Sequence, residues 1–399
     1  MTSTGPQPSS PPTSAPALVR AVIGIDASRA VVSPRTGTEQ YSASLLEALS
    51  HLPAARSSRV VLYVNLPSIS QAVHLLGFDL PACWRTRAIP FPRLWTHLRL
   101  SAEMLIRAPD VLFVPSHVVP LWHSAHTVVT VHDLGYLYYP QAHTRWSRLY
   151  LHLSTKFSCR AARRIIAISE ATKRDLIRHY KVPAHKINVV YHGHDQVFRP
   201  VRDPAHIEQV AARYGVRRPY CIHVGTLQPR KNLLLLVEVW DLLRRDMGEA
   251  NTPHLLLAGK QGWLYGDLLN AVQARGLGGL VRFADYAPRE DLPALYSGAL
   301  ALTFPSLYEG FGLPVLEAMA CGTPVLASTA SSLPEVVGEA GMLLDPHDAH
   351  AWAKAVRHLL ADAGLREALS RRGLARARQF TWERCAAHTW QVLTQGWTT

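Results

Sequence analysis

Short apolar runs alternate with longer amphipathic stretches along almost the whole chain. The runs are rich in Val, Ile and Leu and several end at Gly, Ser or Asp, as buried parallel strands do. The stretches between them, such as 41–52 and 232–243, repeat apolar residues at helical spacing. This alternation predicts βαβ units and an α/β fold of parallel sheets with helices on both faces. The predicted strands are 21–27, 59–65, 111–116, 126–133, 164–170, 187–193, 220–225, 254–259, 281–286, 299–306 and 323–328.

The series of strands restarts near residue 218, after a segment without strand character. A chain of 399 residues accommodates two domains of about 100–200 residues each. We therefore predict two doubly wound domains with a linker near 198–206. The predicted parts are a disordered Pro/Ser/Thr tail at 1–17, an N-terminal domain at 18–200, a C-terminal domain at 201–380 and a final segment at 381–399.

The net charge of +13 is unevenly distributed. Residues 1–200 hold 22 Lys and Arg against 10 Asp and Glu, whereas residues 201–399 hold 20 against 19. A basic half indicates contact with nucleic acid, anionic lipid or a phosphorylated substrate, or merely a proteome of high isoelectric point. The five cysteines form no C-x-x-C pair, which argues against a zinc site and a disulfide framework and fits a reducing cytosol. No apolar run approaches the roughly 18–20 residues that cross a bilayer, so we expect a soluble or peripheral protein.

Two glutamates flank a glycine turn after the predicted strand 299–306. Ligands of doubly wound sheets bind beyond the carboxyl ends of the strands, where Glu309 lies. A helix is predicted to start next, with Glu317 on its first turn. Carboxylates accept hydrogen bonds from hydroxyl groups, and a helix N-terminus offers free N–H donors. This stretch therefore predicts a site for a polyhydroxylated ligand such as a sugar or ribose.

A basic pair follows the predicted strand 220–225. Gly225 and Thr226 form a turn, and Arg230 and Lys231 stand just before the next helix. Arg offers a planar fork of donors and Lys a point charge, so the segment predicts a diphosphate site.

The first half of the chain contributes weaker candidates. His132 ends the predicted strand 126–133 and could bind a sugar hydroxyl, polarise a reacting centre, or only donate a structural hydrogen bond. The stretch with Gly37 and Thr38 resembles a phosphate-facing loop but lacks G-x-G-x-x-G. The chain also has no P-loop signature, which argues against an NTPase. The histidines show no metal-ligand spacing, so no metal site is predicted.

The combination of these motifs resembles a known family. Glu309 and Glu317, with GFGLPVLEAMACGTPVLAS between and beyond them, resemble the E-x7-E signature of retaining glycosyltransferases of family 4, which have the GT-B fold. GTLQPRKN (225–232), RIIAISEATKRDL (164–176), YHGHD (191–195) and FTWERCAAHTW (380–390) add to the similarity, which extends over about 18–397.

The resemblance implies roles for single residues. Arg230 and Lys231 would bind the donor diphosphate, Glu317 the ribose, and Glu309 would lie beside the donor sugar. His132 would lie near the transferred sugar, and the final helix would cross back to the first domain. The catalytic group would thus comprise Glu309, His132, Arg230 and Lys231. The other donor contacts would come from Gly37 and Thr38 (where the usual glycine pair is reduced), Gly225, Thr226, Tyr286 near the base, and the backbone of Gly310, Phe311, Gly312 and Leu313.

The resemblance also implies a reaction. With no D-x-D motif, the transfer would need no metal or other cofactor, and Glu309 would position the sugar rather than attack it. The expected donor is GDP-mannose. UDP-glucose is an open alternative, as are a nucleotide-sugar 2-epimerase and a non-catalytic binder on the same fold.

The acceptor is expected to be a glycan or a polyprenyl or other lipid-linked molecule, as in polysaccharide biosynthesis, and not a nucleic acid. The basic, partly apolar segments 91–109 and 145–164 could contact an anionic membrane. The expected location is the cytoplasm, with peripheral contact at the inner membrane face.

Overall fold

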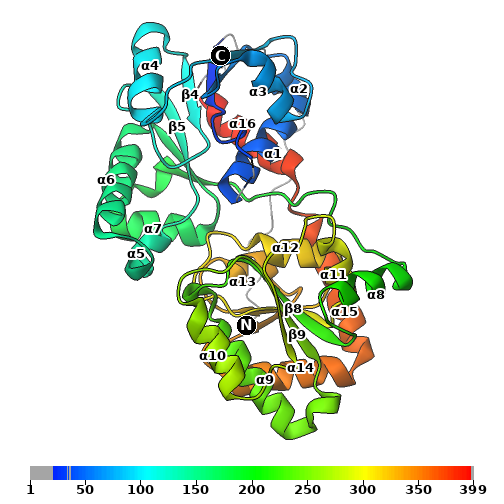
Figure 1. Ribbon diagram of the computed structural model, residues 1–399. Coiled ribbons are helices and arrows are strands. Elements are labelled where there is room, and N and C mark those ends of the chain that lie inside the picture. The colour runs from blue at the N-terminus through cyan, green and yellow to red at the C-terminus, as the bar shows by residue number, and fades with distance from the viewer. Residues whose placement is uncertain (1–20, 34, 36, 397–399) are drawn as a thin grey trace, which may run out of the picture.

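The computed structural model describes residues 21–396 except 34 and 36. The predicted tail at 1–17 and the last three residues lie outside the described part. The described chain forms two sheet-and-helix bodies, one above the other in Figure 1. The upper body holds α1 to α7 and α16, and the lower one holds α8 to α15.

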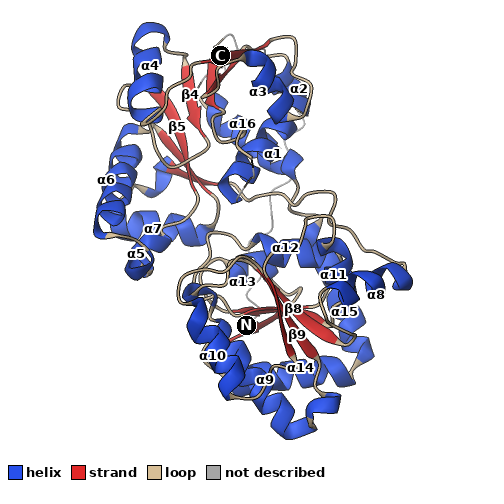
Figure 2. Cartoon of the chain, viewed as in Figure 1, coloured by secondary structure: helices blue, strands red, loops and turns tan. Residues whose placement is uncertain are grey.

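The upper body is built on a parallel sheet of seven strands in the order β3-β2-β1-β4-β5-β6-β7. Helices cover both faces of the sheet, as the strand-helix alternation predicts (Figure 2). Its strands are β1 (Ile23–Asp26), β2 (Val60–Val64), β3 (Trp84–Ala88), β4 (Val111–Val114), β5 (His126–Val131), β6 (Arg164–Ala167) and β7 (Ile187–Val189). Its helices are α1 (Gly37–His51), α2 (Pro53–Arg56), α3 (Ile69–Leu76), the π-helical η1 (Thr96–Leu100), α4 (Ser101–Arg107), α5 (Gly135–Tyr138), η2 (Pro140–Ala142), α6 (Arg145–Ala161), α7 (Glu170–Tyr180) and η3 (Ala184–Lys186).

The lower body is built on a parallel sheet of six strands in the order β10-β9-β8-β11-β12-β13. Its strands are β8 (Tyr220–Val224), β9 (His254–Ala258), β10 (Val281–Ala284), β11 (Ala301–Phe304), β12 (Val325–Ser328) and β13 (Met342–Leu344). Its helices are α8 (Pro204–Arg213), η4 (Pro229–Lys231), α9 (Leu233–Met247), η5 (Glu249–Asn251), α10 (Tyr265–Ala274), α11 (Leu292–Gly298), α12 (Leu313–Ala320), α13 (Leu333–Val337), α14 (Ala349–Ala361) and α15 (Ala363–Ala377).

The chain passes between the two bodies twice, and the two passages adjoin. The last helix, α16 (Trp382–Thr394), returns to the upper body and packs on α1, where Cys385, Ala386 and Trp390 join its core. The two passages meet where the N–H of His194 donates to the carbonyl of Phe380 at 3.2 Å.

The structure contains two strands that the apolar pattern does not predict. β3 has the sequence WRTRA, whose arginines alternate with other residues on the edge of the upper sheet. β13 is three residues long and forms the edge of the lower sheet. Edge strands need only one buried face, so they lack the continuous apolar run of central strands. Among the described residues, no helix has the length and apolar character needed to span a membrane.

Candidate active site

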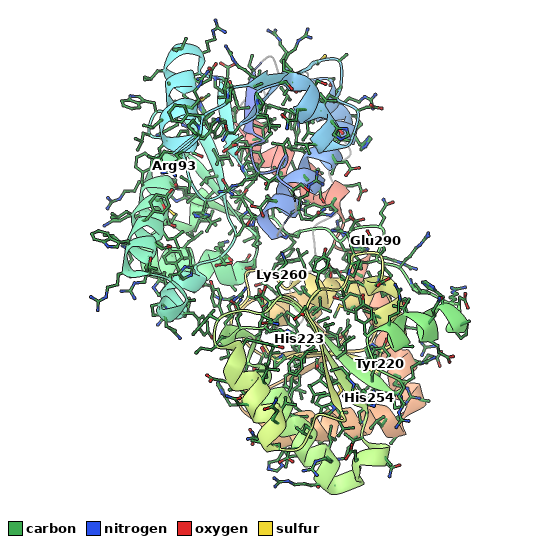
Figure 3. All side chains as sticks on the ribbon, viewed as in Figure 1. Arg93, Tyr220, His223, His254, Lys260 and Glu290 are labelled. Atoms are coloured by element: carbon green, nitrogen blue, oxygen red, sulfur yellow. The ribbon has the colours of Figure 1, made fainter. Side chains whose placement is uncertain are left out.

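The two predicted donor motifs meet at the centre of the lower sheet. β8 and β11 are neighbours there, and the chain leaves β8 toward β9 but β11 toward β12. Such a switch in strand order opens a crevice at the carboxyl ends of the strands. Residues 225–232 follow β8, and residues 306–312 follow β11. Figure 3 shows His254, at the start of β9, far from the upper body and Lys260, just past its end, facing that body.

The basic pair and Glu309 form one buried cluster. Lys231 Nζ lies 2.5 Å from Glu309 Oε1, and Arg230 Nη1 lies 3.3 Å from Glu309 Oε2. Lys231 is 6% exposed and Glu309 is 7% exposed, whereas the Arg230 side chain is 28% exposed. Arg230 also donates to the backbone carbonyl of Tyr308 at 3.0 Å. The loop after β11 is therefore tied to the turn after β8.

Burial and charge act in opposite directions on this cluster. Burial alone would raise the pKa of Glu309, but Lys231 and Arg230 outweigh it and hold that pKa below its ordinary value. Burial lowers the pKa of Lys231, and the attraction of Glu309 opposes that shift. We take the three groups to be charged near pH 7, so that two cations share one anion and one positive charge is left over.

A neutral aromatic floor lies beneath the ammonium group of Lys231. The Nζ atom stands 4.9 Å from the centre of the Phe304 ring, which stacks on His223. Burial, with the charge of Lys231, lowers the pKa of His223 to about 3, so this ring is neutral. Its Nδ1 lies 3.1 Å from the carbonyl oxygen of Thr303, which assigns the ring proton to Nδ1. The floor therefore adds no competing charge to the crevice.

The glycines of both motifs lie where a side chain would be strained or crowded. Gly225 has a φ of 145°, and a Cβ there would stand 3.6 Å from Lys231 Nζ. Gly312 has a φ of 104° and caps α12, and a Cβ on Gly310 would stand 2.5 Å from the carbonyl oxygen of His132. Thr226 is exposed at the end of β8. Phe311 and Leu313 complete the turn, buried and half-buried respectively.

Glu317 lies at the start of the second turn of its helix rather than on the first turn. α12 begins at Leu313 with Pro314 in its first turn, as predicted, and Glu317 is its fifth residue. The carboxylate accepts a hydrogen bond from Tyr296 at 3.2 Å, and Arg289 attracts it. Burial nevertheless raises the pKa of Glu317 to about 7. The cluster therefore brings together Arg230, Lys231 and Glu309, whereas Glu317 interacts with Tyr296 and Arg289 instead.

His132 reaches the crevice from the upper body. It follows β5, and its Nε2 lies 2.8 Å from the carbonyl oxygen of Pro115. The ring meets Tyr41 and His192 edge-on, with centroids 4.8 and 5.9 Å apart. Burial lowers the pKa of His132, so the ring is neutral at neutral pH. The contact between its carbonyl and Gly310 brings the end of β5 against the turn after Glu309.

The remaining predicted donor residues with side chains, and Gly37, are outside the buried cluster and more exposed. Gly37 and Thr38 form the first turn of α1 and are exposed and half-buried respectively. Tyr286 is 64% exposed on the loop after β10, and Lys260 Nζ lies 6.0 Å from its ring centre. Within residues 21–396, positions 34 and 36 excepted, no three His, Cys, Asp or Glu side chains are grouped to hold a metal ion.

The sequence patterns miss the residues that join the two bodies next to Glu309. Tyr308 hydrogen-bonds Asp175 of α7 at 2.8 Å across the crevice. Glu335 of α13 accepts the backbone N–H groups of Glu170 and Ala171 at the start of α7, at 2.7 and 3.0 Å. Tyr308 stands inside the recognised motif, but its partner is 133 residues away, which no local pattern reveals.

Comparison with known proteins assigns both halves of the chain to known families. The family model for glycosyl transferases group 1 matches residues 210–376, and the model for glycosyltransferase family 4 matches residues 36–198. The first match covers both donor motifs after β8 and β11, and the second covers β5 and α7.

Similar proteins are found both by sequence and by fold. O-antigen chain mannosyltransferase B of Escherichia coli is 37% identical over 66% of this chain and 68% of its own length. D-inositol 3-phosphate glycosyltransferase of Salinispora tropica is 33% identical over 67% of this chain but only 57% of its own length. Sucrose-phosphate synthase of Thermosynechococcus elongatus has the same fold with a TM-score of 0.71 at 24% identity, covering 94% of this chain and 99% of its own. The chain therefore belongs to glycosyltransferase family 4 and is a hexosyltransferase of the GT-B fold.

Proposed function

We propose that the chain transfers a mannosyl group from GDP-mannose to a glycan or lipid-linked acceptor, with retention of configuration and without a metal ion. The observation that carries the proposal is the buried cluster of Arg230, Lys231 and Glu309 at the switch point of the lower sheet. Its unbalanced positive charge suits a diphosphate that gains negative charge as the sugar departs. Arg230 and Lys231 take the place that a metal ion would otherwise hold.

Glu309 acts in this proposal as a positioning group. Two cations hold its pKa low, so it is a poor proton donor. Both carboxylate oxygens are ion-paired, Oε1 with Lys231 and Oε2 with Arg230, so neither is free to attack a sugar carbon. A glycosidase would need one free carboxylate and one protonated carboxyl on either side of the bond. These contacts favour transfer, in which a donor phosphate oxygen takes the proton of the acceptor.

The choice of mannose follows the relatives. Two curated relatives are named as mannosyltransferases, O-antigen chain mannosyltransferase B and the serotype-specific mannosyltransferase WbdA, both of Escherichia coli. A structure of Anabaena Alr3699/HepE is a complex with UDP-glucose, but it is 18% identical and speaks for the fold alone. UDP-glucose therefore stays the second candidate donor.

An outward apolar stripe on α6 supports a lipid-linked acceptor. Trp146, Leu149, Leu153 and Phe157 recur at helical spacing and are exposed, with Trp146 81% exposed. The opposite face of α6 is the buried one and carries small side chains such as Ser158. A helix that presents its apolar face to solvent is typical of a membrane-contacting surface.

The stripe continues onto η1 and α4. His97 hydrogen-bonds Tyr150 of α6 at 2.9 Å, which joins the two segments, and the neighbouring Leu98 is exposed. Trp95 belongs to the segment 91–109, which is predicted to contact a membrane, but it is buried, and its indole N–H donates to the carbonyl of Ile89 at 2.7 Å. The basic residues of this half suit the anionic inner face of a membrane, where nucleotide sugars and lipid-linked acceptors meet.

Turnover and binding with purified protein test the transfer. GDP release from GDP-mannose in the presence of acceptor lipid extract should fall by orders of magnitude when Arg230 and Lys231 become Gln and Met together. Arg245→Gln, which removes an ion pair on the surface of α9, is the matched control and should retain turnover. Near-normal turnover of the double variant would refute the site. A larger thermal shift with UDP-glucose than with GDP-mannose would change the donor.

Vesicle sedimentation tests the membrane contact. The full chain should pellet with phosphatidylglycerol vesicles and stay in the supernatant with phosphatidylcholine. The pair Trp146→Ser and Leu153→Ser should lose this binding, whereas Leu234→Ser, an equally exposed leucine on α9, should keep it. Binding that is unaffected by the α6 pair would refute the assigned surface.

A further inference from the structure

Tyr308 belongs to the lower body, but its side chain is satisfied in the upper one. The phenol donates to Asp175 Oδ2 at 2.8 Å and accepts the backbone N–H of Leu134 at 3.0 Å. Its ring stacks on Tyr138 of α5 at 4.7 Å between centroids. The residue is 6% exposed in this arrangement. Separation of the two bodies would therefore break both of these hydrogen bonds and expose a large ring.

Asp175 is a buried carboxylate that receives one phenol from each body. Tyr138, from its own body, donates to Oδ1 at 2.5 Å, and Tyr308 donates to Oδ2. Hydrogen bonds to an ionised acceptor are about twice as strong as those between neutral groups. Without Tyr308, Asp175 would keep a single phenolic donor and the N–H of Leu134 would lose its acceptor. The closed state, in which the two bodies are in contact as observed here, is thus stabilised by the hydrogen bonds of Tyr308 to Asp175 and Leu134.

The same residue is tied to the catalytic cluster through its backbone. Arg230 donates to the carbonyl of Tyr308 at 3.0 Å and to the carboxylate of the next residue, Glu309, at 3.3 Å. The N–H of Leu307 donates to the carbonyl of Arg230 at 2.9 Å. A shift of the Tyr308 side chain would therefore be passed directly to Arg230 and Glu309.

We propose that Tyr308 is a positioning residue that couples closure of the two bodies to the placement of the Arg230–Lys231–Glu309 cluster. Asp175 and Leu134 hold the phenol only when the bodies are closed, and the loop carrying Glu309 is then fixed against β5. In the open state the loop loses this anchor. The donor diphosphate can still bind to the lower body, but transfer waits for closure. This inference rests on the proposed transfer of a sugar from a nucleotide donor.

Three variants of the full chain test the coupling. Tyr308→Phe removes the hydroxyl and keeps the ring that stacks on Tyr138. Asp175→Asn weakens the acceptor from the other side. Tyr180→Phe is the matched control, because the Tyr180 hydroxyl bonds Tyr136 at 2.5 Å and His152 at 3.0 Å within the upper body alone.

The expected signature is a split between kcat and nucleotide binding. Tyr308→Phe should lower kcat about tenfold to a hundredfold, the range expected for a hydrogen bond to a charged group. The Kd of GDP, measured by calorimetry, should stay within about threefold, because the binding side chains are untouched. Asp175→Asn should lower kcat in the same direction, and the double variant should lose little more than Tyr308→Phe. Tyr180→Phe should leave kcat unchanged.

Three kinetic results would overturn the coupling. These are an unchanged kcat in Tyr308→Phe, losses that multiply in the double variant, or an equal loss of kcat in Tyr180→Phe. Small-angle scattering gives a test that needs no substrate. Tyr308→Phe should have a larger radius of gyration than the wild type, and equal radii would contradict the role of Tyr308 in closure. If the wild type binds no nucleotide and releases none, the donor assignment fails, but the scattering comparison still decides the coupling.

Discussion

Removing the charge of Lys231 should destabilise the protein measurably, even without substrate. Lys231→Met keeps the length of the side chain but leaves Glu309 buried with only Arg230 at 3.3 Å. Breaking a buried ion pair by removing one partner costs about 3–5 kcal/mol. Because Arg230 remains, we expect a loss near the lower end, about 3 kcal/mol. For a domain of about 150–250 residues, such as the lower body, each kcal/mol of lost stability lowers Tm by about 2–4 °C. The expected decrease in Tm is therefore about 6–12 °C.

The matched variant is Lys231→Met combined with Glu309→Gln. It removes both charges, so most of the lost stability should return while turnover stays abolished, which separates folding from chemistry. Differential scanning calorimetry of the ligand-free proteins at pH 7 measures the shift. The reasoning is refuted if Lys231→Met melts within about 2 °C of the wild type, since a shift that small corresponds to 1 kcal/mol or less. A double variant no more stable than the single one would also refute it.

The pH dependence of this shift has a definite sign. The pKa of Glu309 in the folded protein lies below its ordinary value of 4.5, so its stabilisation is present above pH 4.5 and is lost as the pH falls through the lower folded value. In Lys231→Met, the pKa of Glu309 is higher than in the wild type, because the lysine charge no longer opposes the effect of burial. Glu309 therefore takes up a proton at a higher pH in the variant. The difference in Tm between the wild type and Lys231→Met should therefore narrow between pH 7 and pH 4.

Three further predictions concern the crevice. Burial raises the pKa of Glu317 to about 7, so this carboxylate loses its charge as the pH falls through 7. GDP should therefore bind more weakly, with a higher Kd, at pH 6 than at pH 8. Glu317→Gln should bind GDP more weakly with little pH dependence, and a pH-dependent Kd in that variant would assign the titration elsewhere. Gly310→Ala places a Cβ 2.5 Å from the backbone oxygen of His132, which cannot move like a side chain, so kcat should fall and wild-type kcat would contradict the contact. Turnover should be unchanged by EDTA, and a loss reversed by added Mg²⁺ would disprove the metal-free mechanism.

The sequence predicts the central elements and the local motifs well, for a physical reason. Central strands such as β8 and β11 are buried on both faces and need continuous apolar runs, which are visible in one dimension. The motifs that follow them carry Arg230, Lys231 and Glu309. Their proximity, however, depends on β8 and β11 being neighbours. Only the family resemblance, which assigns these residues to one donor site, anticipates that they lie together.

The features that were missed depend on tertiary contacts. β3 has one arginine-bearing face because it ends the sheet, so its pattern is that of a polar segment. Trp95 is next to exposed apolar residues in the sequence, yet it is buried and donates a hydrogen bond to the carbonyl of Ile89. The anchor of Tyr308 on Asp175 joins residues far apart in the chain. In each case the deciding partner lies outside the local window.

The return of α16 to the upper body means that the lower body is, in its connectivity, an insertion within the upper one. The chain enters and leaves the lower body at adjacent points, where His194 meets Phe380 and a Cβ on Gly193 would collide with the backbone of Trp382. Because the two connections adjoin, they form one hinge between the bodies rather than two separate ones. We therefore expect a protein cut near residue 200 to remain one particle. The fragment after the cut carries α16, which packs on α1 of the fragment before the cut.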